Sequence, residues 1–461
     1  MKSPINSKAA RCWLESLLRD RYGLDLELEI DNGNYVLSLR GGSAEPAIYI
    51  PIIECFYSES SATIPCSEYL LNTWQDDLPS VQSLVSPGIS APVYPLVEMF
   101  SNRTVLRYDA LGLAYWALNR WEEYAVGDEW RDEHNRFPYS ASHACKFDYG
   151  DRPVVDEWFV ILGAVIQKTW PNVSLKKHYY SVSLSHDVDR PSRYGYTTTL
   201  AYFMAVGGDL LHRRYPIATI ARSPSMRIKS RLNLSPLDPY NTFDFLMDSA
   251  EELGLAATFN FFGGGSDVKF DANYHLNFPS MRKLIQSIST RGHHIGLHPS
   301  YQSGVSELKI SSELESLRRA CKSLGVREEI SSARMHYLRL NIPETWVRLE
   351  ETGIEVDTSL AYAERPGFRC GSCYKYKPFN ILSGKSMDIE IQPLVAMDSS
   401  LFNEKYLGYT YAEAVEKVSE YIERCRSVSG CFSLLWHNST LNNDELKSVY
   451  RNIVGIAGAK A

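Results

Sequence analysis

Two aspartates, Asp187 and Asp189, close an apolar, hydroxyl-rich run in the segment SVSLSHDVD. Side chains alternate faces along a strand, so both carboxylates lie on one face and His186 lies on the other. Two acids on one face at the end of a strand indicate a site. Because an Asp-x-Asp pair also occurs in turns and at helix caps, this interpretation depends on the polar groups that other strands supply.

Four later segments place polar residues at the end of a short extended run. In GHHIGLH, His294 and His298 share one strand face and are candidate metal ligands, with structural histidines as the alternative. In SSARMHYLR, Arg334 is placed to pair with an acid and hold it ionised, the alternative being a surface ion pair. Asp357 ends the run IEVD, where a helix cap is the alternative. His437 ends FSLLWHN, a position that suits a general acid.

The elements that must position these residues alternate regularly from about residue 178. Helices are expected between the extended runs, at Phe243 to Leu253, Met281 to Thr290, Glu313 to Leu324, Glu344 to Thr352, Tyr411 to Cys425 and Asp444 to Ile453. Such alternation implies parallel strands joined by right-handed crossovers, and about seven such units favour a closed or nearly closed barrel. We therefore predict an α/β fold for residues 176–461, a distorted (β/α) barrel of about seven parallel strands whose carboxyl ends carry the site.

Residues 1–175 have a mixed pattern and are predicted to form a smaller α+β domain. The expected elements are a helix from Ala9 to Tyr22, a hairpin that turns at Asp31, Asn32 and Gly33, and helices from Ala110 to Tyr124 and from Val154 to Trp170. His134, His143 and Asp148 in this region lack the regular spacing of metal ligands. We expect the domain to serve in packing, orientation or substrate capture, and its sequence does not choose between these roles.

The composition excludes several classes of protein. A chain of 461 residues with 44% hydrophobic and 22% charged residues is typical of a soluble protein with two domains. The net charge of −7 argues against a nucleic-acid partner. The longest apolar run, around Trp158 to Ile166, is too short to span a bilayer. The first 23 residues have the pattern of an amphipathic helix and not of a secretory signal, so we expect a cytoplasmic protein.

Nine cysteines are scattered along the chain without the framework of a small disulfide-bonded domain. An odd number in this arrangement indicates reduced thiols. Cys370 and Cys373 form the one CxxC pair, and without a second pair to complete a zinc site they are expected to be incidental thiols of a surface loop.

Six segments, SHDVD, AATFNFF, GHHIGLH, RMHY, VDTS and LLWH, occur in that order. Their order and spacing resemble the polysaccharide deacetylase family, the NodB-type domain of carbohydrate esterase family four, over about residues 178–456, with residues 1–175 as an extra domain. The Asp-Val-Asp form is similar to the branch that contains sugar deformylases and peptidoglycan deacetylases. The resemblance implies a distorted barrel of parallel strands and metal-dependent removal of an acyl group from an amino sugar.

The resemblance also implies a role for each matching residue. Asp187 would be the base that takes a proton from the attacking water, and His437 the acid that protonates the leaving amine. Asp189 and His298 would bind a divalent metal, zinc first, with cobalt or manganese as alternatives. Arg334 would orient and tune the base. Neighbouring side chains are expected to contact the substrate, namely His336, Tyr337, Asp357 and Trp436.

One position departs from the pattern of that family. The family supplies a second histidine four residues after the first, and here the residue is Gln302, whose amide oxygen is a weak ligand. The candidates for a third ligand, in order of preference, are His294, His336, Gln302 and His186.

We therefore expect a cytoplasmic N-deacylase, in the first place a deacetylase, that acts on an amino sugar in a nucleotide-linked or lipid-linked precursor of a surface glycan. Two alternatives remain open. One is a carbohydrate-binding or scaffold protein that keeps the barrel but has lost turnover through the missing histidine. The other is a metal-independent hydrolase of a cyclic amide.

Overall fold

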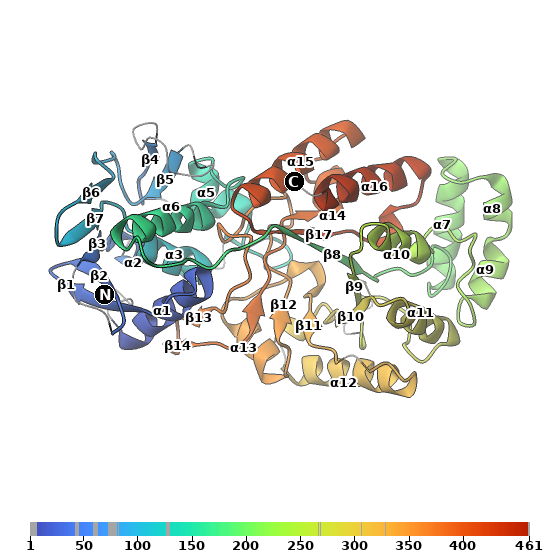
Figure 1. The fold of residues 1–461 in the computed structure, drawn as a ribbon. Helices are drawn as coiled ribbons and strands as arrows, with labels where there is room; N and C mark the ends of the chain where they lie inside the picture. Colours follow the sequence, from blue (N-terminus) through green and yellow to red (C-terminus); the bar gives the residue numbers. More distant parts are fainter. Residues whose placement is uncertain are drawn as a thin grey trace.

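The computed structural model describes residues 7–41, 46–58, 63–71, 81, 83–125, 130–265, 267, 269–305, 307–327 and 329–459. Two large sheets organise them (Figure 1). One has five strands and belongs to the amino-terminal part of the chain, and the other has eight strands and belongs to the remainder. Helices of the second part flank the eight-stranded sheet (Figure 1).

The eight-stranded sheet has the order β15-β12-β11-β10-β9-β8-β17-β16, and every neighbouring pair in it is parallel. Its strands are β8 (Ser181–Asp187), β9 (Ala257–Phe261), β10 (His294–Leu297), β11 (Ser332–Ala333), β12 (Val356–Asp357), β15 (Glu390–Ile391), β16 (Ala396–Met397) and β17 (Cys431–Leu435). The predicted parallel, barrel-like α/β sheet is present, with eight strands where about seven were expected.

The two edge strands, β15 and β16, are neighbours in the sequence, with only residues 392–395 between them. This connection is hydrogen-bonded to both sides of the sheet. The amide of Leu394 donates to the carbonyl of Leu360, 3.0 Å away, beyond β12, and the amide of Val395 donates to that of Ser433, 3.2 Å away, on β17. The sheet therefore curls until its first and last strands are joined by one short segment, which gives it the form of a distorted barrel.

The helices that follow the strands carry an apolar stripe toward the sheet. These helices are α10 (Phe243–Glu251), α11 (Pro279–Thr290), α12 (Glu307–Ser323), α13 (Glu344–Glu351), α14 (Asp398–Phe402), α15 (Tyr411–Ser427) and α16 (Asp444–Gly458). In α15, the side chains of Ala414, Val418, Tyr421 and Cys425 are buried at helical spacing. The helix begins with a capping box, in which Thr410 and Glu413 satisfy each other's backbone amides.

Three helices after β8 were absent from the sequence expectation. They are α7 (Thr199–Leu211), α8 (Ile217–Ala221) and α9 (Ser223–Lys229). In Figure 1 they extend beyond the barrel at its far end from the amino-terminal part.

The five-stranded sheet of the amino-terminal part has the order β1-β2-β3-β7-β6. Its strands are β1 (Leu26–Asp31), β2 (Asn34–Leu39), β3 (Ala47–Pro51), β6 (Val97–Met99) and β7 (Arg103–Leu106), and β4 (Cys66–Leu70) pairs with β5 (Ser83–Pro87) separately. The predicted hairpin is confirmed, since β1 and β2 pair antiparallel around Asn32 and Gly33. Both residues have positive φ, 47° and 77°, as a two-residue hairpin turn of the primed type requires.

The helices of this part are α1 (Lys8–Tyr22), α2 (Cys55–Ser58), α3 (Ala110–Leu118), α4 (Trp121–Ala125), α5 (His143–Lys146) and α6 (Val154–Thr169). The single helix expected from Ala110 to Tyr124 is two helices, because Arg120 has a φ of 51° and interrupts the turn.

The two parts share one hydrophobic core, which runs from Ala10 to Ala457. A buried ion pair also joins them, with Nη2 of Arg369 2.6 Å from a carboxylate oxygen of Glu123. Cys370 and Cys373 lie beside this contact and are fully buried, so the expectation of a surface loop was wrong. All nine cysteines are free thiols, as predicted. Within the described residues, no helix has the length and hydrophobicity needed to cross a bilayer.

Candidate active site and metal centre

The polar strand ends singled out in the sequence meet at one edge of the barrel. Asp187 ends β8, His298 follows β10, His336 follows β11 and His437 follows β17 by two residues. Parallel strands bring their carboxyl ends to the same edge, which is why residues far apart in the sequence converge there. With Asp189, these four residues line a cavity of about 940 Å³.

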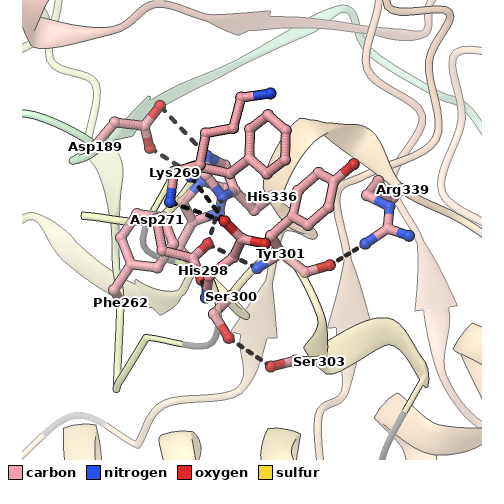
Figure 2. Close-up of polar contacts among 12 residues, drawn as sticks. Asp189, Phe262, Lys269, Asp271, His298, Ser300, Tyr301, Ser303, His336 and Arg339 are labelled. Carbon is pink, nitrogen blue, oxygen red and sulfur yellow. Dashed lines mark hydrogen bonds and ion pairs between the residues drawn. The ribbon is translucent and has the colours of Figure 1, made fainter. Parts of the chain in front are cut away.

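Asp189, His298 and His336 each offer one ligand atom, and the three atoms lie within 4.8 Å of one another. Nε2 of His298 is 3.2 Å from Oδ1 of Asp189, and Nε2 of His336 is 3.9 Å from its Oδ2. Figure 2 shows the carboxylate and the two rings facing each other. Oδ1 of Asp189 and Nε2 of His298 are buried and make no hydrogen bond to any described residue. Buried polar atoms rarely stay unsatisfied, and two imidazole nitrogens with one carboxylate form a ligand set typical of zinc.

A hydrogen bond at Nδ1 of each histidine ring fixes which nitrogen of that ring faces the cluster. Nδ1 of His298 is 2.5 Å from the carbonyl oxygen of Arg334, and Nδ1 of His336 is 3.0 Å from Oδ1 of Asp271. Both oxygens can only accept, so each Nδ1 carries the proton and donates. Nε2 is then the nitrogen that each ring can offer to a cation when the ring is neutral, as in other histidine metal sites.

The pKa values of the cluster follow from burial and mutual charge. Burial raises the pKa of Asp189, but its contact with His298 and the charges of His336 and His437 hold that pKa well below its usual range. Burial lowers the pKa of His298, and the carboxylates of Asp187 and Asp189 outweigh burial and raise it. Asp189 is therefore ionised at neutral pH, the form that binds a cation.

Asp187 lies beside this cluster and is held by neighbouring strands. The side-chain amide of Asn260, on β9, donates to its Oδ1 over 2.7 Å, and Nε of Arg334 is 3.9 Å from the same oxygen. On the neighbouring strand β10, the glycine at position 296 leaves room for the side chain of Asn260. A Cβ at Gly296 would stand 2.1 Å from Oδ1 of Asn260. Asp187 is thus a buried carboxylate fixed by an amide and faced by a guanidinium.

His437 is held by Asp398, the first residue of α14. Asp398 accepts from the backbone amide of His437 at 3.0 Å and from its Nδ1 at 2.7 Å. Nε2 of His437 then points to the cluster, 3.6 Å from Oδ2 of Asp189. Burial lowers the pKa of His437, but Asp398, together with Asp189 and Asp187, outweighs burial and raises it to about 10. The direction of this shift favours the protonated imidazolium.

The structure does not bring His294, the preferred third ligand, to the cluster. His294 begins β10 and is exposed, whereas His298 follows the other end of the same strand. Four residues of strand separate them by roughly 13 Å. His336 occupies the position expected of His294. Gln302 does not line the cavity, and His186 faces α16 and the carbonyl of Trp436, as its strand face predicted.

Two of the four expected substrate contacts are not at the cavity. Trp436 is fully buried, with its ring 5.2 Å from that of Tyr450 on α16. Asp357 is also fully buried and accepts from Nε1 of Trp346 at 3.1 Å. Tyr337 does line the cavity, and so does His336, although the position of His336 is that of a ligand.

The residues of the site that the sequence did not indicate include Asn260, Asp271, Asp398 and Arg136. Asn260 gave a signal, because it is a polar residue within the apolar run AATFNFF, and Asp398 follows a short strand as the other site residues do. Asp271 lies in a loop and gave none. Arg136 comes from the amino-terminal part, lines the cavity, and donates to the carbonyl of Tyr337 (3.0 Å) and to the hydroxyl of Tyr406 (3.1 Å).

Comparison with known proteins gives a family for the amino-terminal part alone. Residues 3–171 match a family of unknown function, DUF7033. No curated protein matches the chain. Among solved structures, a protein described as a polysaccharide deacetylase from Mycobacterium smegmatis is similar at 16% identity and a TM-score of 0.41, over 62% of this chain and 85% of that one. The allantoinase PuuE is similar at 12% identity and a TM-score of 0.38, over 62% and 86%.

Proposed function

We propose that the protein is a metal-dependent N-deacylase that removes an acyl group, in the first place acetyl, from an amino sugar. The observation that carries the proposal is the meeting of Asp187, Asp189, His298, His336 and His437 in one cavity at the carboxyl ends of the strands. The ordered motifs of the second part, which resemble those of polysaccharide deacetylases, support the same reaction. An amide needs both a base for the water and an acid for the amine.

The metal would be held by Asp189, His298 and His336. When bound, it supplies a positive charge that polarises the acyl carbonyl and lowers the pKa of a nearby water. Its identity is proposed as zinc, with cobalt or manganese as alternatives, because the donor set is two imidazoles and one carboxylate.

Asp187 is the proposed base. The amide of Asn260 fixes one of its oxygens, and the other, Oδ2, lies 3.7 Å from Nε2 of His298 and so borders the proposed metal position. Arg334 faces the fixed oxygen, with its Nε 3.9 Å away, and so places a positive charge beside the base.

His437 is the proposed acid. Asp398 binds Nδ1 and thereby directs Nε2–H toward the cavity. A leaving amine must gain a proton as the carbon–nitrogen bond breaks, and the imidazolium form of His437 holds one. This pairing resembles a histidine oriented by an aspartate in other acyl-transfer sites.

His336 bears on the choice between an enzyme and an inactive descendant. The alternative of a carbohydrate-binding scaffold arose because Gln302 replaces a histidine of the resembled family. His336 offers a strong ligand in the same cluster, so the chain does not depend on Gln302 for a third donor. We therefore favour the enzyme.

The substrate is proposed to carry phosphate, as a nucleotide-linked or lipid-linked amino sugar does. Four cationic side chains line the cavity; Arg136 and Arg193 are paired with Asp132 and Asp209, and the argument rests on the other two, Arg190 and Lys269. Arginine and lysine near a substrate pocket suit phosphate groups, which a free sugar lacks.

The test is acyl release measured by mass spectrometry. Purified protein loaded with zinc, cobalt or manganese is incubated with free, nucleotide-linked and lipid-linked N-acyl amino sugars. We expect loss of acetyl or formyl mass with the wild type, and a rate 10²- to 10⁴-fold lower with Asp187→Asn, about the contribution of a general base. Asp20→Asn, an exposed aspartate far from the cavity, serves as the control and should keep full activity. Intact substrates with every metal would refute the proposal.

A further inference from the structure

The helices α7, α8 and α9 form a separate projection at the end of the barrel remote from the amino-terminal part (Figure 1). A small apolar cluster joins Tyr194, in the loop before α7, to Tyr202 of α7 and Met226 of α9. Asp209 of α7 is buried and accepts from Arg193 at 2.7 Å and from the hydroxyl of Tyr194 at 3.1 Å. The projection is therefore positioned by its own contacts, and the inward face of α7 is the one that carries the acid.

The outward face of α7 is apolar. Its exposed side chains are between 52% and 78% accessible and recur at positions i, i+3, i+4, i+10 and i+11: Leu200, Phe203, Met204, Leu210 and Leu211. That spacing is the stripe by which a helix normally packs on a core. Here the stripe is exposed, and Met204 at its margin also lines the cavity.

Helices α8 and α9 add one exposed apolar side chain each, Ile217 and Ile228, which are 79% and 78% exposed. Of the twenty large apolar side chains that are exposed among the described residues, nine lie between Leu200 and Leu237. Scattered apolar residues are ordinary on a surface, whereas a contiguous set indicates an interaction site.

The charge of the same segment is the reverse of that of the chain. Residues 199–231 contain six basic side chains and one acid, the buried Asp209, a net charge of +5, although the whole chain has a net charge of −7. The basic residues are Arg213, Arg214, Arg222, Arg227, Lys229 and Arg231. Five of the six are exposed, and they lie beside the apolar stripe in the sequence.

We propose that α7, α8 and α9 form a docking surface for an anionic lipid bilayer. Helices with an apolar face and basic neighbours lie in the interface of a membrane, where the apolar side chains enter the acyl boundary and the cations contact acidic headgroups. A second copy of the chain is a poorer occupant, because a symmetric contact would bring two surfaces of +5 together.

The docking surface is continuous with the cavity. Ala201, Met204 and Ala205 of α7 line the same cavity as Asp187 and Asp189. Binding to a bilayer would place the mouth of the cavity next to the headgroups. The consequence that the amino-sugar substrate is lipid-linked rests on the proposed function, whereas the docking itself does not.

The test is sedimentation of the full chain with vesicles, either of equal parts phosphatidylglycerol and phosphatidylcholine or of phosphatidylcholine alone. We expect the wild type to bind the anionic vesicles and to bind the neutral ones more weakly. Phe203→Glu with Leu211→Glu should lower the partition coefficient more than tenfold. Arg213→Ala and Arg222→Ala should each lower it about fivefold. The controls Leu382→Glu and Lys385→Ala change exposed residues elsewhere and should bind as the wild type does.

Three results would overturn the proposal: no binding of the wild type to anionic vesicles, equal losses in the controls, or a dimer in light scattering that Phe203→Glu dissociates while vesicles stay unbound. Thermal melting identifies variants that fail to fold, and the charge variants provide an independent test in that case. Asp187→Asn should bind vesicles normally, so a failure of the deacylase proposal leaves the docking result intact.

Discussion

Replacing His336 with alanine tests which residue is the third metal ligand. The structure indicates His336, whereas the alternation of side chains along the strand favoured His294. His336→Ala removes one of three donors within 4.8 Å, while His294→Ala alters an exposed residue at the other end of β10. We expect His336→Ala to lose stoichiometric metal binding and His294→Ala to bind metal as the wild type does.

The hydrogen bond from His336 to Asp271 determines how much metal affinity a milder substitution, Asp271→Asn, should remove. Asp271 accepts from Nδ1 of His336 at 3.0 Å, and Asp271→Asn weakens this acceptor without removing the ligand. Partners of this kind contribute 10- to 100-fold in metal affinity. The expected loss is therefore about 1.4 to 2.8 kcal/mol of binding free energy. His336→Ala should exceed it, because the donor atom itself is lost.

The assay is competition for zinc against a chromogenic chelator near neutral pH, with cobalt absorption as a second readout of coordination. Asp271 also accepts from the amide of Tyr301 at 2.7 Å, so each variant is melted to show that it is folded. The reasoning is refuted if His336→Ala and His294→Ala bind zinc equally well, or if Asp271→Asn binds more tightly than the wild type.

Other contacts give three further expectations. Glu123→Ala should lower the free energy of unfolding in urea by about 3 to 5 kcal/mol, because it leaves the buried guanidinium groups of Arg120 and Arg369 without their shared carboxylate; a loss below 1 kcal/mol would contradict this. Stability should fall as pH decreases from about 6.5 to about 4, since burial lowers the pKa of His143 to about 4 and the unfolded chain takes up the proton first. The share of His143 in that loss approaches about 3 kcal/mol, and His143→Gln should lack this share while keeping the one from His186, whose pKa burial also lowers to about 4. Gly296→Ala should slow turnover about a hundredfold by displacing the amide that fixes the base, and unchanged turnover would argue against that amide.

Local patterns in the sequence predicted much of the fold. The turn at Asn32 and Gly33 and the helix stripe of α15 depend on neighbouring residues, and both are present. The alternation of strands and helices predicted parallel pairing, because crossover connections follow from chain length and handedness. The projection of α7 to α9 was not predicted, since an apolar stripe in a sequence is expected to meet a core.

The sequence indicated those residues of the site that lie at the carboxyl ends of strands. Asp187, Asp189, His298 and His437 meet because each lies at or just beyond the carboxyl end of a parallel strand. The alternation of side chains along a strand predicts the face on which a residue lies, but not how close the residue is to the carboxyl end of the strand. For that reason it favoured His294 over His336. Asp271 comes from a loop, whose path no periodic pattern determines.

The continuous core has a consequence for how the chain can be cut. A truncation near residue 175 would divide one hydrophobic cluster and leave Arg369 buried without Glu123. It would also remove Arg136 from the wall of the cavity. The barrel expressed alone should therefore aggregate, and chimeras that exchange the amino-terminal part should fold only if the matching contact face is exchanged with it.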